Sequence, residues 1–346
     1  MMGMPAGGIR DETMRDHPHD SSPSSHGDDG IPAPAHPEFR REPLPWQTPK
    51  PAQDDASAPE RVRAIMASAS YRVADQDIDF LNQPASRGVR LQIDYLKAEL
   101  VLTRLGVERT IVVFGSTRLP EPVAARRRVD ELSVAASKAP GDAALARRLG
   151  AARKILDKSR YYDIAREFGR LVGAAGAGPE DCRLMVMTGA GPGIMEAANR
   201  GAFDAGAKSI GLNITLPQVQ FPNPYVTPEL AFSFHYFALR KMHFLQRACA
   251  LVVFPGGYGT MDELFETLAL IQTRKIAPVP VILVGAPFWT RAFDVGFLID
   301  EGVIDVEDRD LYWYAETAQE IWNGLVRWHD ANGTPLHAGR SGKPSP

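Results

Sequence analysis

The sequence predicts an α/β fold in which helices cover both faces of a doubly wound parallel sheet. From residue 109 onward, short unbroken apolar runs alternate with helical stretches. Such runs are typical of strands buried on both faces, because neither face of a covered parallel sheet meets water. In addition, two glycine-rich segments stand where a strand is expected to pass into a helix. Sheets of this kind bind their ligands at that end of the strands.

The expected strands and helices alternate along the second two thirds of the chain. The strands cover residues 110–114, 184–187, 208–212, 230–234, 251–254 and 279–284. The helices cover residues 161–174, 194–205, 236–247 and 261–273, and two more follow the last strand. Because a helix joins most strands to the next, consecutive strands are expected to run parallel.

Composition divides the remainder of the chain. Residues 1–60 are rich in Pro, Asp, Ser, Gly and His and lack apolar periodicity, so we expect a disordered tail. Residues 61–108 predict a helical cap, with a shorter helix near 75–81 that ends before Pro84. The α/β sheet domain is expected over residues 109–335, followed by a flexible C-terminal tail at 336–346.

A charged helical insertion is predicted at residues 121–160, inside the sheet domain. It carries the runs Arg126-Arg127-Arg128 and Arg147-Arg148. Two interpretations remain open: a surface for an anion or a partner, or a pair of helices whose charges only face water. The histidines of the N-terminal tail are expected to be solvated and not to bind a metal; they are His17, His19, His26 and His36.

Charge and cysteine content limit the class of protein. The net charge is −3, so neither nucleic acid nor an anionic membrane is expected as a partner. Cys182 and Cys249 adjoin apolar runs, which predicts buried thiols in a reducing compartment and no thiolate zinc site. There is no signal-peptide profile and no apolar run of about 20 residues, so we expect a cytoplasmic protein.

The first glycine-rich segment is Thr188 followed by Gly189-Ala190-Gly191-Pro192-Gly193. Glycines let the backbone turn tightly and approach a ligand closely, and the next helix offers free N–H groups and a partial positive charge. The segment differs from the dinucleotide-binding pattern because Pro192 interrupts it. A purely structural turn is the alternative interpretation.

The second segment, Pro255-Gly256-Gly257-Tyr258-Gly259-Thr260, predicts a compact phosphate cradle. It lacks the Gly-Lys-Ser/Thr of a Walker A loop. Asp262 and Glu263 follow in the first turn of the next helix, where acids also occur simply to complement the helix dipole. Arg240-Lys241 stands one helix earlier, where it could hold phosphate, orient a carboxylate, or form an ordinary surface pair.

These residues resemble the Lonely Guy family of cytokinin riboside 5′-monophosphate phosphoribohydrolases, which are often labelled lysine decarboxylases. The resemblance extends over roughly residues 110–325 and rests on three motifs: Gly189-Ala190-Gly191-Pro192-Gly193-Ile194-Met195-Glu196, Arg240-Lys241, and Pro255-Gly256-Gly257-Tyr258-Gly259-Thr260-Met261-Asp262-Glu263. The chain departs from the family in having Ala190 where a glycine is usual, and in lacking an acid within Gln218-Val219-Gln220.

The resemblance implies a Rossmann-like fold, a homodimer or higher homo-oligomer, and neither a metal nor an organic cofactor. It implies a hydrolase that cleaves the N-glycosidic bond of a nucleoside 5′-monophosphate to give the free base and ribose 5-phosphate. Arg240 and Glu263 are implied to be the catalytic pair. The implied substrate- and phosphate-binding residues are Ser116, Gly191, Gly193, Met195, Glu196, Lys241, Gly256, Gly257, Gly259, Thr260 and Asp262.

Three other functions were weighed. A nucleotide or molybdenum-cofactor carrier of the same fold is the main alternative, and the presence of both Arg240 and Glu263 argues against it. A pyridoxal-phosphate lysine decarboxylase is rejected, since nothing marks a Schiff-base lysine with its pyridinium partner. A nucleic-acid-binding module is disfavoured by the near-neutral charge, although the basic insertion leaves it open.

Overall fold

The computed structural model describes residue 40 and residues 42–336, and it divides the chain into two compact units. The first unit ends at Asp77, and its described part holds a 3-10 turn at Pro45–Gln47, helix α1 (Ala58–Met66) and a second turn at Ala69–Tyr71. The second unit begins at Ile78 and contains the sheet. The boundary therefore falls inside the predicted helical cap. The four tail histidines and residues 337–346 lie outside the described part.

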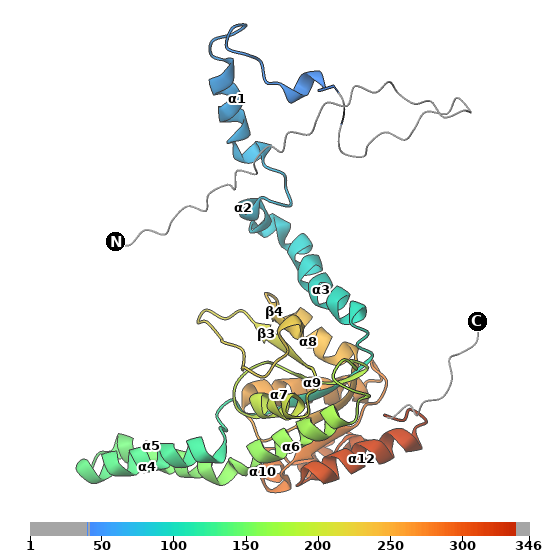
Figure 1. The fold of residues 1–346 in the computed structure, drawn as a ribbon. Coiled ribbons are helices and arrows are strands. Elements are labelled where there is room, and N and C mark those ends of the chain that lie inside the picture. The colour runs from blue at the N-terminus through green and yellow to red at the C-terminus, as the bar shows by residue number, and fades with distance from the viewer. Residues whose placement is uncertain (1–39, 41, 337–346) are drawn as a thin grey trace. The chain divides into compact units, whose positions relative to one another are not determined.

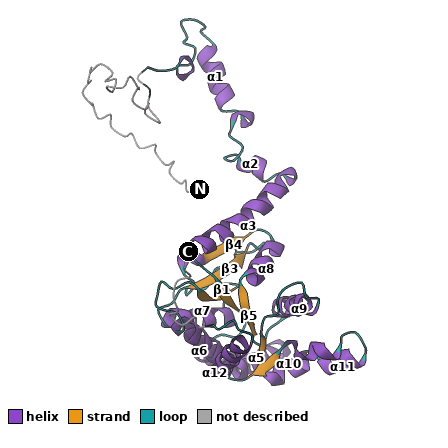
Figure 2. Cartoon of the chain, turned by 90° about the vertical axis from the view of Figure 1, so that its right-hand side faces the viewer, coloured by secondary structure: helices purple, strands orange, loops and turns teal. Residues whose placement is uncertain are grey.

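A seven-stranded, wholly parallel sheet forms the centre of the second unit (Figure 2), which confirms the predicted fold class. The strand order is β4-β3-β2-β1-β5-β6-β7. The strands are β1 (Arg109–Phe114), β2 (Leu184–Thr188), β3 (Ser209–Ile214), β4 (Ala231–Phe234), β5 (Ala248–Val253), β6 (Val281–Val284) and β7 (Trp313–Ala315). The sequence did not indicate β7, because three residues show no periodicity.

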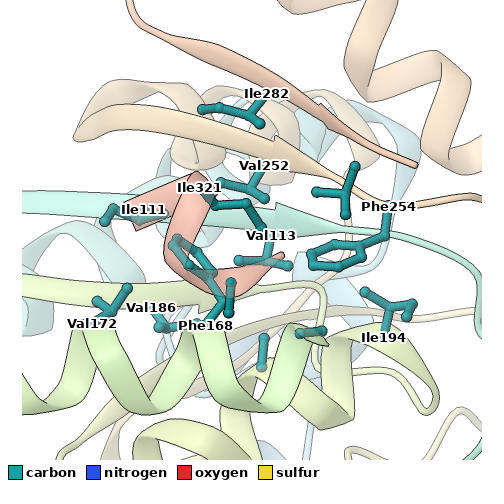
Figure 3. Close-up of a cluster of buried hydrophobic side chains, with 14 of the residues drawn as sticks. Ile111, Val113, Phe168, Val172, Val186, Ile194, Val252, Phe254, Ile282 and Ile321 are labelled. Carbon is teal, nitrogen blue, oxygen red and sulfur yellow. The ribbon is translucent and has the colours of Figure 1, made fainter. Parts of the chain in front are cut away.

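Alternate residues of β1 face two separate apolar cores. Ile111 and Val113 point to the face covered by α6 (Arg160–Ala174), α7 (Ile194–Asp204) and α12 (Ala318–Ala331), as Figure 3 shows. Val112 and Phe114 belong to the other core. That second face is covered by α3 (Arg87–Arg104), α8 (Phe237–Gln246), α9 (Tyr258–Gln272) and α10 (Ala286–Ala292). Burial on both faces explains why the strand sequences are unbroken apolar runs.

The strand order places a switch point beside β1. The chain builds β2, β3 and β4 on one side of β1 and then returns to add β5, β6 and β7 on the other. At such a point the loops after the two neighbouring strands diverge and leave a crevice at the carboxyl ends. The loops after β1, β2 and β5 contain the two glycine-rich segments, so the topology brings both to one edge of the sheet.

Helix α3 is joined to the second face by charged contacts. Asp94 accepts hydrogen bonds from the backbone N–H groups of His235 and Tyr236, at 3.1 and 3.0 Å. Glu99 forms a two-pronged ion pair with Arg247, with both nitrogen–oxygen distances 2.7 Å. These contacts hold both ends of α8, the helix that carries Arg240 and Lys241: Asp94 at its start and Glu99 at its end.

The charged insertion consists of α4 (Pro122–Lys138) and α5 (Ala143–Lys158), which pack against each other and extend away from the sheet (Figure 1). Asp142 caps α5 by accepting from the N–H groups of Ala144 and Leu145. The two arginine runs of the insertion are exposed: Arg126, Arg127 and Arg128 on α4, and Arg147 and Arg148 on α5. Two short helices, α2 (Ile78–Leu81) and α11 (Val295–Asp300), complete the second unit, and no described helix has the length and hydropathy needed to cross a membrane.

Two glycines allow α6 and α7 to pack closely. A Cβ on Gly201 would lie 1.8 Å from the carbonyl oxygen of Arg166, and one on Gly169 would lie 2.1 Å from that of Ala198. We expect Gly201→Ala to lower the free energy of unfolding by about 2–3 kcal/mol, because backbone atoms cannot move aside cheaply. Gly150, inside α5, is the control: its Cβ would meet nothing within 4 Å, so Gly150→Ala should raise stability by about 0.5–1 kcal/mol. Urea unfolding measures both, and equal effects would contradict this account of the packing.

Candidate active site

Three loops meet at the carboxyl edge of the sheet, on either side of β1. The N–H of Ser116 donates to the carbonyl oxygen of Pro255 at 3.0 Å, and the carbonyl oxygen of Ser116 accepts from the N–H of Ile194 at 3.2 Å. Ser116 thus lies between the first glycine loop (residues 189–193) and the second glycine loop (residues 255–260). The structure brings together the two glycine-rich segments that the sequence placed at the ligand-binding end of the strands.

The second glycine loop presents bare backbone at the start of α9. A Cβ on Gly256 would lie 2.1 Å from Oγ1 of Thr260, so this glycine is required by packing. At Gly257 and Gly259 a Cβ would meet nothing within 4 Å. The first N–H groups of a helix have no acceptor within it and point outward with a partial positive charge. The loop can therefore receive an anion directly on its backbone.

The first glycine loop is held in a strained, tightly packed conformation. Gly193 has φ +74°, and its Cβ would lie 2.4 Å from the carbonyl oxygen of Ser116. Ala190 is fully buried and has φ 59°, a left-handed conformation that alanine rarely adopts. Strain of this kind is typical of functional loops.

A buried polar network supports the first loop, and the sequence did not predict it. Thr188 donates through its hydroxyl to Oδ1 of Asn199 at 2.7 Å, and Nδ2 of Asn199 donates to Oγ of Ser209 at 2.9 Å. Asn223 donates to Oδ1 of Asn199 at 3.0 Å and to the carbonyl oxygen of Gly191 at 3.1 Å. The one signal in the sequence was an asparagine inside an otherwise apolar helix face. The network fixes the loop because a buried amide that lost its partner would be costly.

Arg240 is fixed between the two loops. Its Nε donates to the carbonyl oxygen of Leu212 at 2.9 Å, and its guanidinium carbon lies 5.5 Å and 5.1 Å from the ring centres of Phe237 and Phe244. A Cβ on Gly189 would lie 2.6 Å from Nη2 of Arg240, so the guanidinium rests directly on the first loop. Burial lowers the pKa of Arg240, and the nearby carboxylate of Glu263 opposes that shift.

Glu263 is a buried carboxyl group in the second turn of α9; the helix begins at Tyr258, so, contrary to the prediction from the sequence, neither Asp262 nor Glu263 lies in its first turn. Its side chain is 8% exposed, and burial raises its pKa to about 7, while the charges of Lys241 and Arg240 limit the rise. Nζ of Lys241 lies 4.0 Å from Oε2 of Glu263. No ion pair within 4.0 Å joins Glu263 to Arg240. A carboxyl with this pKa exchanges its proton near neutral pH, which suits acid–base chemistry.

Lys241 and Asp262 are paired with each other. Nζ of Lys241 lies 2.8 Å from Oδ2 of Asp262 and 2.8 Å from Oε2 of Glu266. This cluster places one positive charge beside the buried carboxyl of Glu263 and keeps it there. Lys241 and Asp262 therefore act on Glu263 through charge, whatever further contact they make with a ligand.

Glu196 takes part in a different set of contacts. Its Oε1 accepts a hydrogen bond of 2.8 Å from the hydroxyl of Tyr162, and Nη1 of Arg200 lies 3.3 Å from that hydroxyl and 2.9 Å from Oε2 of Glu121. Neighbouring Met195 points instead to the first loop, where its Sδ and Cε would lie 3.0 and 2.8 Å from a Cβ on Gly189 and Gly191. Met195 and Arg240 thus both rest on Gly189, and Glu263 is near enough to Arg240 for its charge to be felt there. Glu196 is held toward α6.

Comparisons with known proteins found similarity over the part of the chain that contains these residues. A family model described as "Possible lysine decarboxylase" matches residues 195–325, a segment that includes Arg240 and the second glycine loop. A probable cytokinin riboside 5′-monophosphate phosphoribohydrolase of Oryza sativa subsp. japonica is 26% identical over 202 residues, which are 54% of this chain and 88% of the rice protein. The chain is also similar to a cytokinin riboside 5′-monophosphate phosphoribohydrolase of Arabidopsis thaliana, at 26% identity over 175 residues, which are 49% of this chain and 77% of that protein.

Two further similarities cover a smaller part of the other protein or have a lower sequence identity. The pyrimidine/purine nucleotide 5′-monophosphate nucleosidase of Escherichia coli K12 is 31% identical over 158 residues, which are 41% of this chain and 31% of that enzyme. Less than one third of the bacterial enzyme is therefore represented here. Among solved structures, the molybdenum cofactor carrier protein of Chlamydomonas reinhardtii aligns at 18% identity with a TM-score of 0.38, covering 65% of this chain and 99% of that one.

The raised pKa of Glu263 predicts a pH-dependent cost to folding. The pKa of Glu263 in the folded state, about 7, lies above its usual value of 4.5. This carboxyl group therefore costs no stability below about pH 4.5, and the free energy of unfolding falls as pH rises through 7. The loss approaches about 3 kcal/mol at pH 8–9. We expect Glu263→Gln to raise the melting temperature by several degrees at pH 8.5 and to change it little at pH 4.5.

Glu266→Gln is the matched control, since it removes a carboxylate that pairs with Lys241 at the surface end of the same cluster. It should bring no gain in melting temperature at either pH. A Glu263→Gln variant that is equally destabilised at both pH values would show that the carboxyl of Glu263 is not held in an unfavourable charged state.

Proposed function

We propose that this chain is a hydrolase that cleaves the N-glycosidic bond of a nucleoside 5′-monophosphate and releases the free base and ribose 5-phosphate. The observation that carries the proposal is the buried carboxyl of Glu263, with a pKa of about 7, at the end of a bare-backbone cradle and opposite the fixed guanidinium of Arg240. The names of the rice and E. coli relatives describe reactions of this type.

The second glycine loop is proposed to bind the 5′-phosphate. The N-terminus of α9 and the open backbone at Gly257 and Gly259 suit a dianion, and the hydroxyl of Thr260 lies beside Gly256 in the same turn. Binding energy gained at the phosphate, remote from the bond that breaks, holds the sugar in position for reaction. Gly191, Gly193 and Ser116 shape the opposite wall of the site.

Glu263 is proposed to act on the anomeric carbon. Cleavage of the bond between C1′ and the base leaves positive charge on the sugar, and a carboxylate nearby stabilises that charge. The same carboxylate can take a proton from the attacking water as the new C–O bond forms. The base departs with the bonding electron pair and is protonated. Arg240, which cannot rotate freely between Phe237 and Phe244, orients Glu263 or the sugar.

We further propose a homodimer or higher homo-oligomer in the cytoplasm, with cytokinin-type or AMP-like nucleotides as substrates. Helices α3 and α8 expose apolar side chains that a second copy could cover; the largest exposed fractions are those of Val89, Ile93, Leu100, Phe237 and Met242. The free, buried thiols of Cys182 and Cys249 suit a reducing compartment. A carrier of a nucleotide or of molybdenum cofactor is the alternative, and it would bind without turnover.

We expect turnover to depend on both members of the proposed catalytic pair. Glu263→Gln should reduce base release by at least 10³-fold while nucleotide binding changes little, and Arg240→Lys should cost about 10²-fold because the planar fork is lost. In the wild-type enzyme kcat/KM should rise with pH through about 7, as Glu263 becomes ionised. Chromatography of the released base on a panel of nucleoside monophosphates measures each value. Bound nucleotide with no release by the wild-type enzyme would favour a carrier.

We also expect the 5′-phosphate to be required. Charge-assisted hydrogen bonds contribute roughly 1.5–3 kcal/mol each, so two or three should separate AMP from adenosine by about 10³-fold in kcat/KM. Gly257→Ala should keep the fold, since its Cβ meets no other atom, yet it should weaken competitive inhibition by ribose 5-phosphate. Equal kcat/KM for adenosine and AMP would contradict the phosphate cradle.

A further inference from the structure

The loop between β3 and β4 contacts the first glycine loop and is held by hydrogen bonds at Gln220 and at Asn223. Nδ2 of Asn213 donates to the carbonyl oxygen of Gln220 at 3.0 Å. Three residues later, the N–H of Asn223 donates to the carbonyl oxygen of Ala190 at 2.8 Å, and its Nδ2 donates to that of Gly191 at 3.1 Å. The backbone at Gln220 is therefore set by hydrogen bonds and not by the side chain.

The side chain of Gln220 is directed at the first glycine loop. Its Nε2 lies 3.7 Å from the position that a Cβ on Gly191 would take. The residue is half-buried, whereas its neighbours Gln218, Val219 and Phe221 are exposed. The side-chain amide has no hydrogen-bond partner among residues 42–336. The backbone at Gln220 is held, and its side-chain amide is partly withdrawn from water without a partner. Such an amide can bind a polar group of a ligand.

A series of neighbouring residues connects Gln220 to the second glycine loop, which is the proposed phosphate site. Glu263 follows the cradle, Arg240 lies between Glu263 and Gly189, and Met195 rests on Gly189 and Gly191. A 5′-nucleotide with its phosphate on the cradle and its anomeric carbon near Glu263 would extend its base in this direction. The thioether of Met195 offers a soft apolar contact for the ring face, and Gln220 lies beyond it.

We propose that Gln220 is the residue that recognises the base, by pairing its amide with an adjacent donor and acceptor on the edge of a purine. This inference rests on the proposed nucleotide site. Adenine offers an amino donor beside a ring-nitrogen acceptor, and a glutamine amide matches such a pair with two hydrogen bonds. The amide can also turn over to meet the oxygen and N–H of a 6-oxopurine. The chain therefore accepts both purine types and discriminates little between them.

The decisive change is Gln220→Glu, because a carboxylate only accepts hydrogen bonds. Guanine presents two adjacent donors, N1–H and the 2-amino group, which match a carboxylate, whereas the ring nitrogen of adenine repels it. We expect the ratio of kcat/KM for GMP to kcat/KM for AMP to rise about tenfold or more. Gln218→Glu is the matched control: it makes the same change two residues away on an exposed side chain, and should leave the ratio unchanged.

Equilibrium binding separates this inference from the proposed function. Dissociation constants of AMP and GMP are measured by calorimetry in the Glu263→Gln background, with and without Gln220→Glu. A shift of about tenfold in their ratio supports base recognition by Gln220, even if the wild-type enzyme releases no base and the hydrolase proposal fails. An unchanged ratio in both turnover and binding, or an equal shift in the Gln218→Glu control, would overturn the role of Gln220 whether or not the hydrolase is active.

Discussion

The two hydrogen bonds of Ser116 are the constraint on which the site depends. They tie the loop after β1 to the second glycine loop on one side and to the start of α7 on the other. A parallel sheet with β1 between β2 and β5 makes this possible, since all three carboxyl ends reach the same edge. Without that order of strands, the cradle and the first glycine loop would be distant turns with no shared surface.

The site stores unfavourable free energy that the surrounding packing must offset. Glu263 is buried with its pKa raised to about 7, Arg240 is withdrawn from water, and Ala190 is held at a positive φ. Each feature lowers stability relative to an ordinary surface loop. Two full apolar cores and the close contact between α6 and α7 supply the compensation. Polar networks then hold the strained loops in one conformation.

The arrangement also separates residues that stand together in the sequence. Met195 and Glu196 are adjacent, yet Met195 rests on the first glycine loop and Glu196 bonds to Tyr162. Successive side chains on a helix point about 100° apart. Two adjacent residues of one sequence motif therefore contact different parts of the protein. Glu196 connects, through Tyr162 and Arg200, to the base of the charged insertion.

The sequence by itself determined six of the seven strands, the helices that follow them and the two glycine loops, because unbroken apolar runs, helical periodicity and glycine clusters are local signals. It also marked Arg240 and Glu263 by their place in motifs. Only the tertiary structure decided that β7 completes the sheet, that Ser116 joins the two loops, that burial raises the pKa of Glu263, and that Gln220 faces the first loop. Those properties depend on distances between residues far apart in the chain and on exclusion of water, which no local pattern of side chains records.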